Sequence, residues 1–347
     1  MILRENYDSE HIKNLKEQTG ANEDIIEKSL FAFGLLEAIA ITGLSFVFKG
    51  GSCLMLLLQE PKRFSTDIDI IVPPGTDIDD FIERAGHIFP FFHHEEQFRK
   101  ANGNIEKRHF KFIYLSPMRD KEVSILLDVL FEEYKYSSTI TKPITNSLIL
   151  TDLSDVEVQI PGINCILGDK LTAFAPHTTG IRIDEQKELE IIKQLFDCAT
   201  LLREMTNFNE VKETYENIVK TEMGYRSLTE SMDDVLFDTI RSAACIVGRG
   251  SLYKSPDYAV YSKGVRAIGS HLLAKKYDML MAGIDACQVM YLASCILSGK
   301  NEFSLLTDYE SYRKEQILQG EFKSLSSIRK VSIENYAYLI ETFKNIS

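Results

Sequence analysis

The sequence predicts an α/β (α+β) core with a mixed β-sheet, followed by a C-terminal all-α helical domain. Three observations lead to this fold class. Residues 48–72 read as a short strand, a Gly-Gly-Ser turn, a short helix and a second strand. Two more apolar, β-rich runs follow and end at Phe131. After Lys170 the chain shows helical periodicity throughout.

The length of the chain is compatible with two domains, because 347 residues can bury two sizeable cores. We expect a core domain with N-terminal helices over residues 1–165 and a helical domain over residues 166–347. Within the second domain, we expect residues 166–204 to complete the active site of the core and residues 205–347 to form a C-terminal bundle.

The individual elements follow from periodicity and from start and stop signals. A helix is expected near 8–18, and another near 22–41, which Asn22 and two acidic residues would open. The segment 134–158 is rich in Ser and Thr and is expected to be irregular. The remaining elements are a helix over 77–87, strands over 107–115 and 123–131, and helices near 208–222, 229–247, 258–276, 279–297, 307–318 and 332–345.

Asp67 and Asp69 form the most informative pair of residues in the chain. Side chains i and i+2 of a strand share a face, so the two carboxylates lie side by side and repel each other unless a cation binds. The upstream turn, Gly50-Gly51-Ser52, opens a helix whose backbone N–H groups can hold a phosphate. Alone, such a pair is often a solvated strand end, and such a turn is often only a turn. Together they predict transfer of a nucleotidyl group from a triphosphate.

These motifs resemble the nucleotidyltransferase superfamily that shares its core with DNA polymerase beta. Its signature is a Gly-Gly or Gly-Ser turn followed, after a short helix, by Asp-x-Asp. More narrowly, KGGSCLMLL (49–57) and RFSTDIDI (63–70) resemble the AbiEii/AbiGii toxin family of bacterial abortive-infection and toxin–antitoxin systems. DKLTA (169–173) and KQLFD (193–197) look like later motifs of that family. The resemblance covers roughly residues 22–204 and implies a nucleotidyltransferase core.

The resemblance also implies a third carboxylate on a neighbouring strand, for which Asp128 is the best candidate. Asp128 lies in an apolar, β-rich run, where an ionised side chain is costly unless it is paired or bound to metal. A hairpin through the turn at 116–120 would bring it alongside the strand of Asp67 and Asp69. The alternative is a capping or salt-bridged aspartate. Asp67, Asp69 and Asp128 would then bind Mg²⁺, with two ions expected and Mn²⁺ also suitable.

Four further residues have roles that the sequence leaves open. By resemblance, Lys170 would contact the oxygens of the NTP triphosphate, and Asp197 would orient Lys170 or a nucleophile. Asp197 could instead only bridge to Lys193 or Arg203. Arg63 would either help Gly50, Gly51 and Ser52 to hold the phosphates or simply brace the turn. His177, in a polar loop, reads as a solvated loop residue rather than a catalyst.

Composition indicates a cytoplasmic protein with no membrane partner. The six cysteines form no CxxC pair and read as reduced, buried thiols. The first fifteen residues lack the apolar core of a signal peptide. The most apolar helix, 279–297, contains Asp285 and Gln288 and reads as a buried core helix.

Charge bears on the acceptor of the reaction. The net charge of −12 argues against indiscriminate nucleic-acid binding. However, residues 241–276 hold seven Lys or Arg against one acid, with Tyr253, Tyr258 and Tyr261 interleaved, and a second basic cluster lies within 99–111. The two basic clusters are interpreted either as solvated faces or as a surface that binds RNA.

The predicted function is metal-dependent transfer of an NMP onto an acceptor hydroxyl, of a tRNA 3′ end or a protein. By resemblance the protein would be the toxin of a toxin–antitoxin or phage-defence pair, with a cognate antitoxin. The alternatives are a nucleotidyltransferase acting on a metabolite or antibiotic, and a catalytically inactive nucleotide-binding module. Intact carboxylates at all three positions speak against the inactive module.

Overall fold

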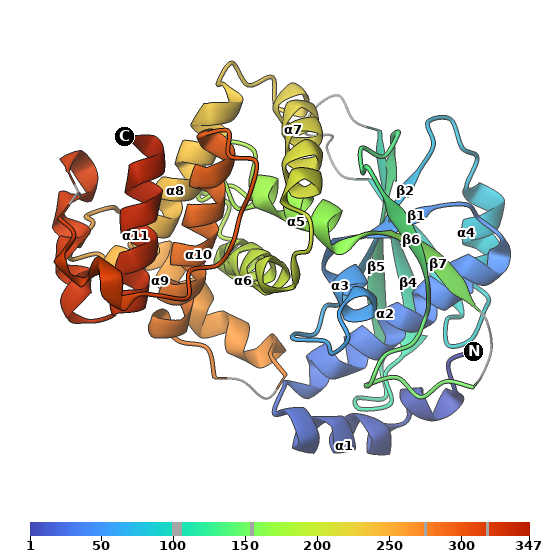
Figure 1. Cartoon of the computed structure of the whole chain (residues 1–347). Coiled ribbons are helices and arrows are strands. Elements are labelled where there is room, and N and C mark those ends of the chain that lie inside the picture. The colour runs from blue at the N-terminus through green and yellow to red at the C-terminus, as the bar shows by residue number, and fades with distance from the viewer. Residues whose placement is uncertain (99–105, 153–155, 274–275, 317–318) are drawn as a thin grey trace. The chain divides into compact units, whose positions relative to one another are not determined.

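The computed structural model describes the chain except for residues 99–105, 153–155, 274–275 and 317–318 (Figure 1). The described chain divides into two compact units. The first contains Met1–Gly162 together with a short returning segment, Gly269–Lys276. The second contains Ile163–Ile268 and Tyr277–Ser347.

The first unit is built on a seven-stranded sheet with the order β3-β4-β5-β2-β1-β7-β6. Its strands are β1 (Val47–Lys49), β2 (Asp67–Val72), β3 (His93–Gln97), β4 (Lys107–Leu115), β5 (Glu122–Phe131), β6 (Thr139–Pro143) and β7 (Glu157–Pro161). The pairs β2–β5 and β1–β7 are parallel, and the other pairs are antiparallel. The sheet is therefore mixed, which confirms the predicted fold class.

Alternation along β4 and β5 separates a core face of the sheet from a polar one. Phe110, Phe112 and Tyr114 are buried on β4, as are Ile125, Leu127 and Val129 on β5. The residues between them point to the opposite face, because successive side chains of a strand alternate. His109 and Asp128 are partly exposed on that opposite face. The pattern leaves one face of the sheet for packing and the other for polar chemistry.

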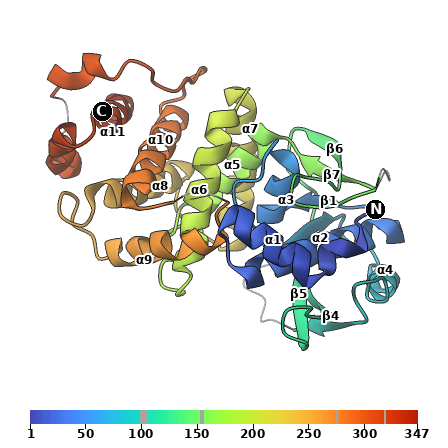
Figure 2. The same cartoon turned by 90° about the horizontal axis from the view of Figure 1, so that it is seen from below.

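The core face is covered by α2 (Glu23–Thr42), which contacts β2, β5, α1 (Ser9–Thr19) and α4 (Asp79–Ala85) (Figure 2). Asn22 caps its start by accepting a hydrogen bond from the backbone of Asp24. Phe31 of α2 stacks on Tyr114, with ring centroids 3.7 Å apart. The buried carboxylate of Glu27 accepts a hydrogen bond of 2.9 Å from the Tyr114 hydroxyl. A 3₁₀ turn, η1 (Arg4–Tyr7), precedes α1, and α3 (Gly50–Leu57) joins β1 to the chain that leads to β2.

The second unit is helical. It contains α5 (Ile163–Ala173), α6 (Glu188–Glu204), α7 (Phe208–Tyr225), α8 (Met232–Gly248), α9 (Tyr258–Ile268), α10 (Met279–Leu297) and α11 (Ile333–Ile346), with two 3₁₀ segments, η3 (Glu310–Lys314) and η4 (Gly320–Lys330). Helix α10 contacts α6, α8 and α11. It is the one described helix long and apolar enough to cross a membrane, and 78% of its apolar window is buried inside the protein. That burial is typical of a core helix.

Three predicted elements differ from the structure. The segment 134–158 is not wholly irregular, because it contains β6, an edge strand whose half-exposed residues carry no apolar run. The helix predicted over 258–276 ends at Ile268 and is followed by a 3₁₀ turn, Gly269–His271. Within the described part of 307–318, only Glu310–Lys314 is helical, and it is a 3₁₀ segment.

Candidate active site

At the turn between β1 and α3, the backbone of Gly50 lies against the carboxylate of Asp69. Gly50 has φ +83°, in the left-handed region that side chains other than glycine rarely adopt. A Cβ atom at this position would overlap the carboxylate of Asp69. Because β1 and β2 pair antiparallel with Lys49 opposite Asp69, the turn begins directly beside that aspartate. Only glycine allows the chain to turn there.

Ser52 and Arg63 brace this turn. The buried Ser52 hydroxyl donates a 2.5 Å hydrogen bond to the backbone carbonyl of Asp67. Arg63 is 5% exposed, and its Nη1 donates to the carbonyl of Phe64 at 3.1 Å. A Cβ on Gly51 would lie 2.7 Å from Nη2 of Arg63, so the guanidinium packs against the glycine backbone. These contacts support the bracing role of Arg63, and phosphate binding by Arg63 stays a prediction.

Three aspartates lie on one face of the sheet. In the parallel pairing of β2 with β5, Asp69 is the direct partner of Asp128. Neighbouring strands are about 4.8 Å apart, so the two side chains are adjacent. Asp67 shares the face of Asp69 and is the most exposed of the three. The predicted β4–β5 hairpin, and the position of Asp128 beside the β2 strand, are confirmed.

The side chains of these aspartates are not gathered into a ready-made metal cluster. Across the residues that the structure describes, no group of three or more His, Cys, Asp or Glu side chains is arranged to hold a metal ion. The backbone therefore brings the three carboxylates to one face, and their roles as metal ligands stay a prediction.

His109 is a site residue that the sequence did not reveal. It is the register partner of Asp128 across the β4–β5 hairpin, and its Nδ1 lies 2.7 Å from Oδ1 of Asp128. A signal was available. Pairing the strands outward from the predicted turn at 116–120, with Leu115 opposite Glu122, places residue 109 opposite residue 128.

In the second unit, Lys170 of α5 and Asp197 of α6 form a buried ion pair. The distance from Nζ to Oδ2 is 3.0 Å, and the two side chains are 10% and 1% exposed. Lys170 also donates to Oε1 of Gln194 at 3.1 Å. Burial, and next the charge of Asp197, raise the pKa of the neighbouring Cys198 thiol well above its ordinary range, so this cysteine stays protonated.

The two other partners considered for Asp197 bond elsewhere. Nζ of Lys193 lies 2.9 Å from Oε1 of Glu190 on the same helix. Arg203 forms its ion pair with Asp285 of α10. Of the three side chains considered as partners of Asp197, the structure therefore places Lys170 against it, and the role of Asp197 in orienting Lys170 or a nucleophile stays a prediction.

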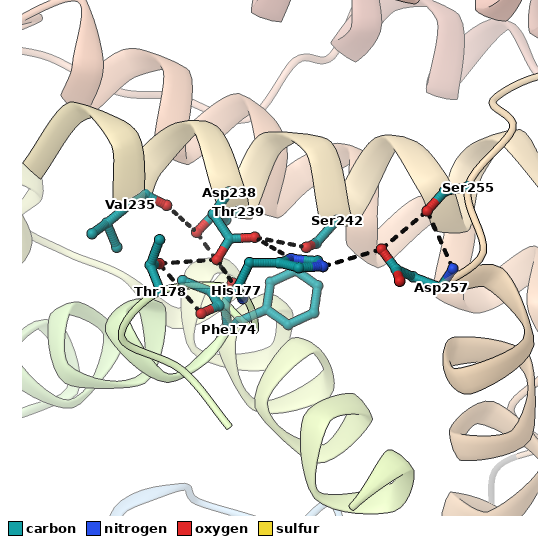
Figure 3. A network of polar contacts seen from close by, with 10 residues as sticks. Phe174, His177, Thr178, Val235, Asp238, Thr239, Ser242, Ser255 and Asp257 are labelled. Atoms are coloured by element: carbon teal, nitrogen blue, oxygen red, sulfur yellow. Dashed lines mark hydrogen bonds and ion pairs between the residues drawn. The ribbon is translucent and has the colours of Figure 1, made fainter. Parts of the chain in front are cut away.

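His177 lies in a loop, as the sequence suggested, with its side chain 46% exposed, but it is also tied to two carboxylates. Figure 3 shows its ring between two carboxylates, Asp238 of α8 and Asp257 just before α9. Nδ1 lies 2.8 Å from Oδ1 of Asp238, and Nε2 lies 3.2 Å from Oδ2 of Asp257. The backbone N–H of His177 and the hydroxyl of Thr178 also donate to Asp238, at 2.8 and 2.9 Å. The contacts fasten the α5–α6 loop to the helices beside it.

Two cations of the basic stretch 241–276 are paired with acids. Arg241 pairs with Glu321 at 3.2 Å, and Lys263 pairs with Glu188 at 2.7 Å. Tyr261 is fully buried, so it offers no surface for stacking bases. Two members of the second basic cluster, Arg99 and Lys100, and Lys275 of the first, lie outside the described residues.

A glycine turn opens a helix beside paired carboxylates on one face of a mixed sheet, which is the arrangement that the sequence predicted for a nucleotidyltransferase. A family model described as the nucleotidyl transferase AbiEii toxin of type IV toxin–antitoxin systems matches residues 35–244. The match covers more than half of the chain, so this protein belongs to the AbiEii nucleotidyltransferase family. No curated protein matches the chain.

Similar solved structures include JHP933 from Helicobacter pylori, at 17% identity and a TM-score of 0.44, covering 79% of this chain and 93% of that one. An antigenic nucleotidyltransferase-like protein from Paracoccidioides brasiliensis matches at 14% identity and a TM-score of 0.36, covering 56% and 89%.

Proposed function

We propose that this nucleotidyltransferase moves an NMP from an NTP onto an acceptor hydroxyl and releases pyrophosphate, with Mg²⁺ bound by Asp67, Asp69 and Asp128. The observation that best supports this is the parallel register of Asp69 and Asp128 beside the turn at Gly50. Carboxylate oxygens are the hard ligands that Mg²⁺ prefers, and Mn²⁺ accepts the same donors. Bound there, two ions would lower the pKa of the attacking hydroxyl and neutralise the triphosphate and the leaving group.

The residues of the turn are proposed to bind the triphosphate through backbone groups. The first N–H groups of a helix have no partner within the helix, so those at the start of α3 can donate to phosphate oxygens. The Ser52 hydroxyl already donates to Asp67, so Ser52 would contribute its N–H rather than its side chain. Arg63 would hold the turn in shape through its contact with Gly51.

Lys170 is proposed to stabilise the negative charge that develops on the triphosphate. Asp197 would keep the ammonium charged and aimed, because a buried cation needs a nearby anion. This role follows from the resemblance of residues 169–173 and 193–197 to family motifs, and the buried pair is the observation that supports it.

The proposed setting is that of a toxin. The matched family is described as the toxin of a type IV system. We therefore propose that the chain acts in the cytoplasm, in phage defence, opposite a cognate antitoxin. The proposed acceptor is a tRNA 3′ end or a protein hydroxyl.

Incubation of the purified protein with each NTP, labelled at the α-phosphate, and with total tRNA or a cell lysate tests this proposal. Label should appear in RNA or in protein, and Asp69→Ala should abolish it while the melting temperature is kept. Asp80→Asn, an 82%-exposed carboxylate on α4, is the matched control and should transfer at the wild-type rate. Nucleotidyl transfer by Asp69→Ala at the wild-type rate would show that Asp69 is not a ligand of a required metal ion. Label found only in small molecules would identify a different acceptor class.

A further inference from the structure

His109 and Asp128 form a hydrogen-bonded pair on the polar face of the sheet. The two residues are direct partners in the antiparallel β4–β5 pairing, and Nδ1 lies 2.7 Å from Oδ1. The imidazole is 15% exposed and the carboxylate is 38% exposed. An ionised carboxylate can only accept hydrogen bonds, so Nδ1 of His109 carries the proton and donates it.

The pair belongs to a row of residues that crosses four strands. The register places Lys49 opposite Asp69, Asp69 beside Asp128, and Asp128 opposite His109. Asp128 therefore has a like charge on one side and a hydrogen-bond donor on the other. Its carboxylate reaches toward β4, where His109 holds one of its two oxygens. Among the described residues, no other side chain bonds Asp128.

Holding Oδ1 fixes the plane of the carboxylate. Free rotation about the Cβ–Cγ bond would otherwise let Asp128 sample many orientations, and repulsion from Asp69 would favour those that point away. With Oδ1 engaged by His109, Oδ2 is the oxygen that remains for a cation. Residues that hydrogen-bond a metal ligand typically change metal affinity by about 10- to 100-fold when they are replaced.

We propose that His109 is a positioning residue of the metal site, which donates Nδ1–H to Asp128 and orients this carboxylate for a divalent cation. The inference rests on the proposed function, in which Asp128 is a metal ligand. If the side chain at position 109 served only to pack against its neighbours, it would not have to be a hydrogen-bond donor. Asp128 itself lies between Leu126 and Leu130 on this face of β5, so an apolar side chain at position 109 would be compatible with its surroundings.

Two substitutions separate donation from packing. His109→Leu replaces the imidazole with an apolar side chain of similar size and removes the donor. His109→Asn places an amide N–H close to the position of Nδ1 and can still donate to Asp128. Titration of Mn²⁺ without nucleotide, followed by electron paramagnetic resonance, reports affinity without any need for turnover. His109→Leu should weaken Mn²⁺ binding about 10- to 100-fold, and His109→Asn should stay within about threefold of wild type.

A control and a double variant complete the test. His93→Leu changes a 58%-exposed histidine on β3 and should leave Mn²⁺ affinity unchanged. Once Asp128→Asn has weakened binding, adding His109→Leu should weaken it no further, because the two residues act together. Thermal melts show whether each variant is folded.

The outcomes are distinguishable. Wild-type or tighter Mn²⁺ binding by folded His109→Leu, or an equal loss in His109→Asn, would overturn the positioning role while the proposed function stands. Unchanged Mn²⁺ binding in Asp69→Ala and in Asp128→Asn would instead remove the metal site, and the role of His109 with it.

Discussion

At the scale of single residues, Gly50 shows how closely the turn is fitted to the carboxylate strand. Gly50→Ala should destabilise the first unit, because alanine at positive φ costs about 1–2 kcal/mol and its Cβ would also overlap Asp69. Gly43 is a matched control, since it has φ +85° with no atom within 4 Å of its would-be Cβ. Chemical denaturation should show a larger loss for Gly50→Ala than for Gly43→Ala. Equal losses would mean that the overlap with Asp69 is relieved without cost.

The Lys170–Asp197 pair carries a second prediction. A lysine that contacted only a triphosphate could be removed without loss of stability, but Asp197 is 1% exposed and depends on Lys170 for charge balance. Lys170→Ala should therefore cost about 3–5 kcal/mol of unfolding free energy, as for other broken buried pairs. It should also slow transfer by about 10²–10³-fold, the usual effect of losing one charge-stabilising donor.

The control for Lys170→Ala removes both charges together. Lys170→Met with Asp197→Asn should recover most of the stability, because no unpaired charge stays buried, and should leave transfer as slow as in the single variant. Urea denaturation and label transfer measure the two effects separately. Recovery of activity in the double variant would make Lys170 a structural residue.

Residue roles were predictable where the residues that act together lie in one short segment of the sequence. The carboxylates of β2 and the glycine turn lie within 20 residues of each other, and alternation alone puts Asp67 and Asp69 on one face. The roles of His109 and His177 depend on partners 19 and 61 residues away in the chain. The partner of His109 follows from the register of the predicted β4–β5 hairpin, whereas a histidine in a polar loop has no local signal that names its partner.

At the scale of elements, the α5–α6 loop is fastened by an imidazole. The hydrogen bond to Asp238 raises the pKa of His177 above its ordinary value of 6.5, and the charges of Asp238 and Asp257 add to this. A histidine whose pKa is raised in the folded state contributes to the free energy of unfolding. This contribution is fully present at pH values below the pKa that the histidine has in the unfolded chain. That stability is lost as the pH rises through the folded pKa.

His177→Gln tests this contribution, because glutamine does not titrate. The unfolding free energy of the wild type should exceed that of the variant, and the difference should be largest below about pH 6. The difference should shrink as the pH rises above the pKa of His177 in the folded state. Urea denaturation of both proteins across this range gives the difference directly. A difference that is constant, or that grows with pH, would contradict a charged imidazole between Asp238 and Asp257.

Long elements with strong periodicity were predictable, and short ones were not. The helix predicted over 279–297 has the bounds of α10, because nineteen consecutive helical residues leave a clear pattern. The edge strand β6 has five residues, half-exposed, and includes Pro143. The 3₁₀ segment Gly320–Lys330 has no α-helical period to detect.

At the scale of the whole molecule, the chain returns to the first unit after α9, which no local pattern indicates. The backbone N–H of Phe64 donates to the carbonyl of His271 at 2.8 Å, and that of Leu273 donates to Lys62 at 3.2 Å. These bonds join backbone groups about two hundred residues apart. Since every residue but proline carries the same backbone donor and acceptor, such a return leaves no signature in the side chains.

The net charge of −12 and the ion pairs of Arg241 and Lys263 lead to the last prediction. Binding of RNA through the basic stretch would release counterions and fall steeply with salt. Lys263 is already paired with Glu188, and Tyr261 is buried, so we expect little of this binding to arise there. Arg249→Glu with Lys263→Glu should therefore change tRNA affinity by less than about threefold, which is less than about 0.7 kcal/mol. Its NTP affinity should be unchanged, because neither residue is among those proposed to hold the triphosphate.

A titration of tRNA at low and moderate salt, with wild type beside the double variant, measures this. A tenfold or larger loss of tRNA affinity with intact NTP binding would show that Arg249 and Lys263 bind phosphates, and that Lys263 exchanges Glu188 for them. The stretch would then be the RNA surface after all, and the acceptor of the transferred nucleotide would be sought in RNA. If affinity is unchanged and label still enters RNA, the acceptor must be held by other residues. The polar face that carries Asp128 and Lys111, on the described strands β4 and β5, is then the next surface to vary.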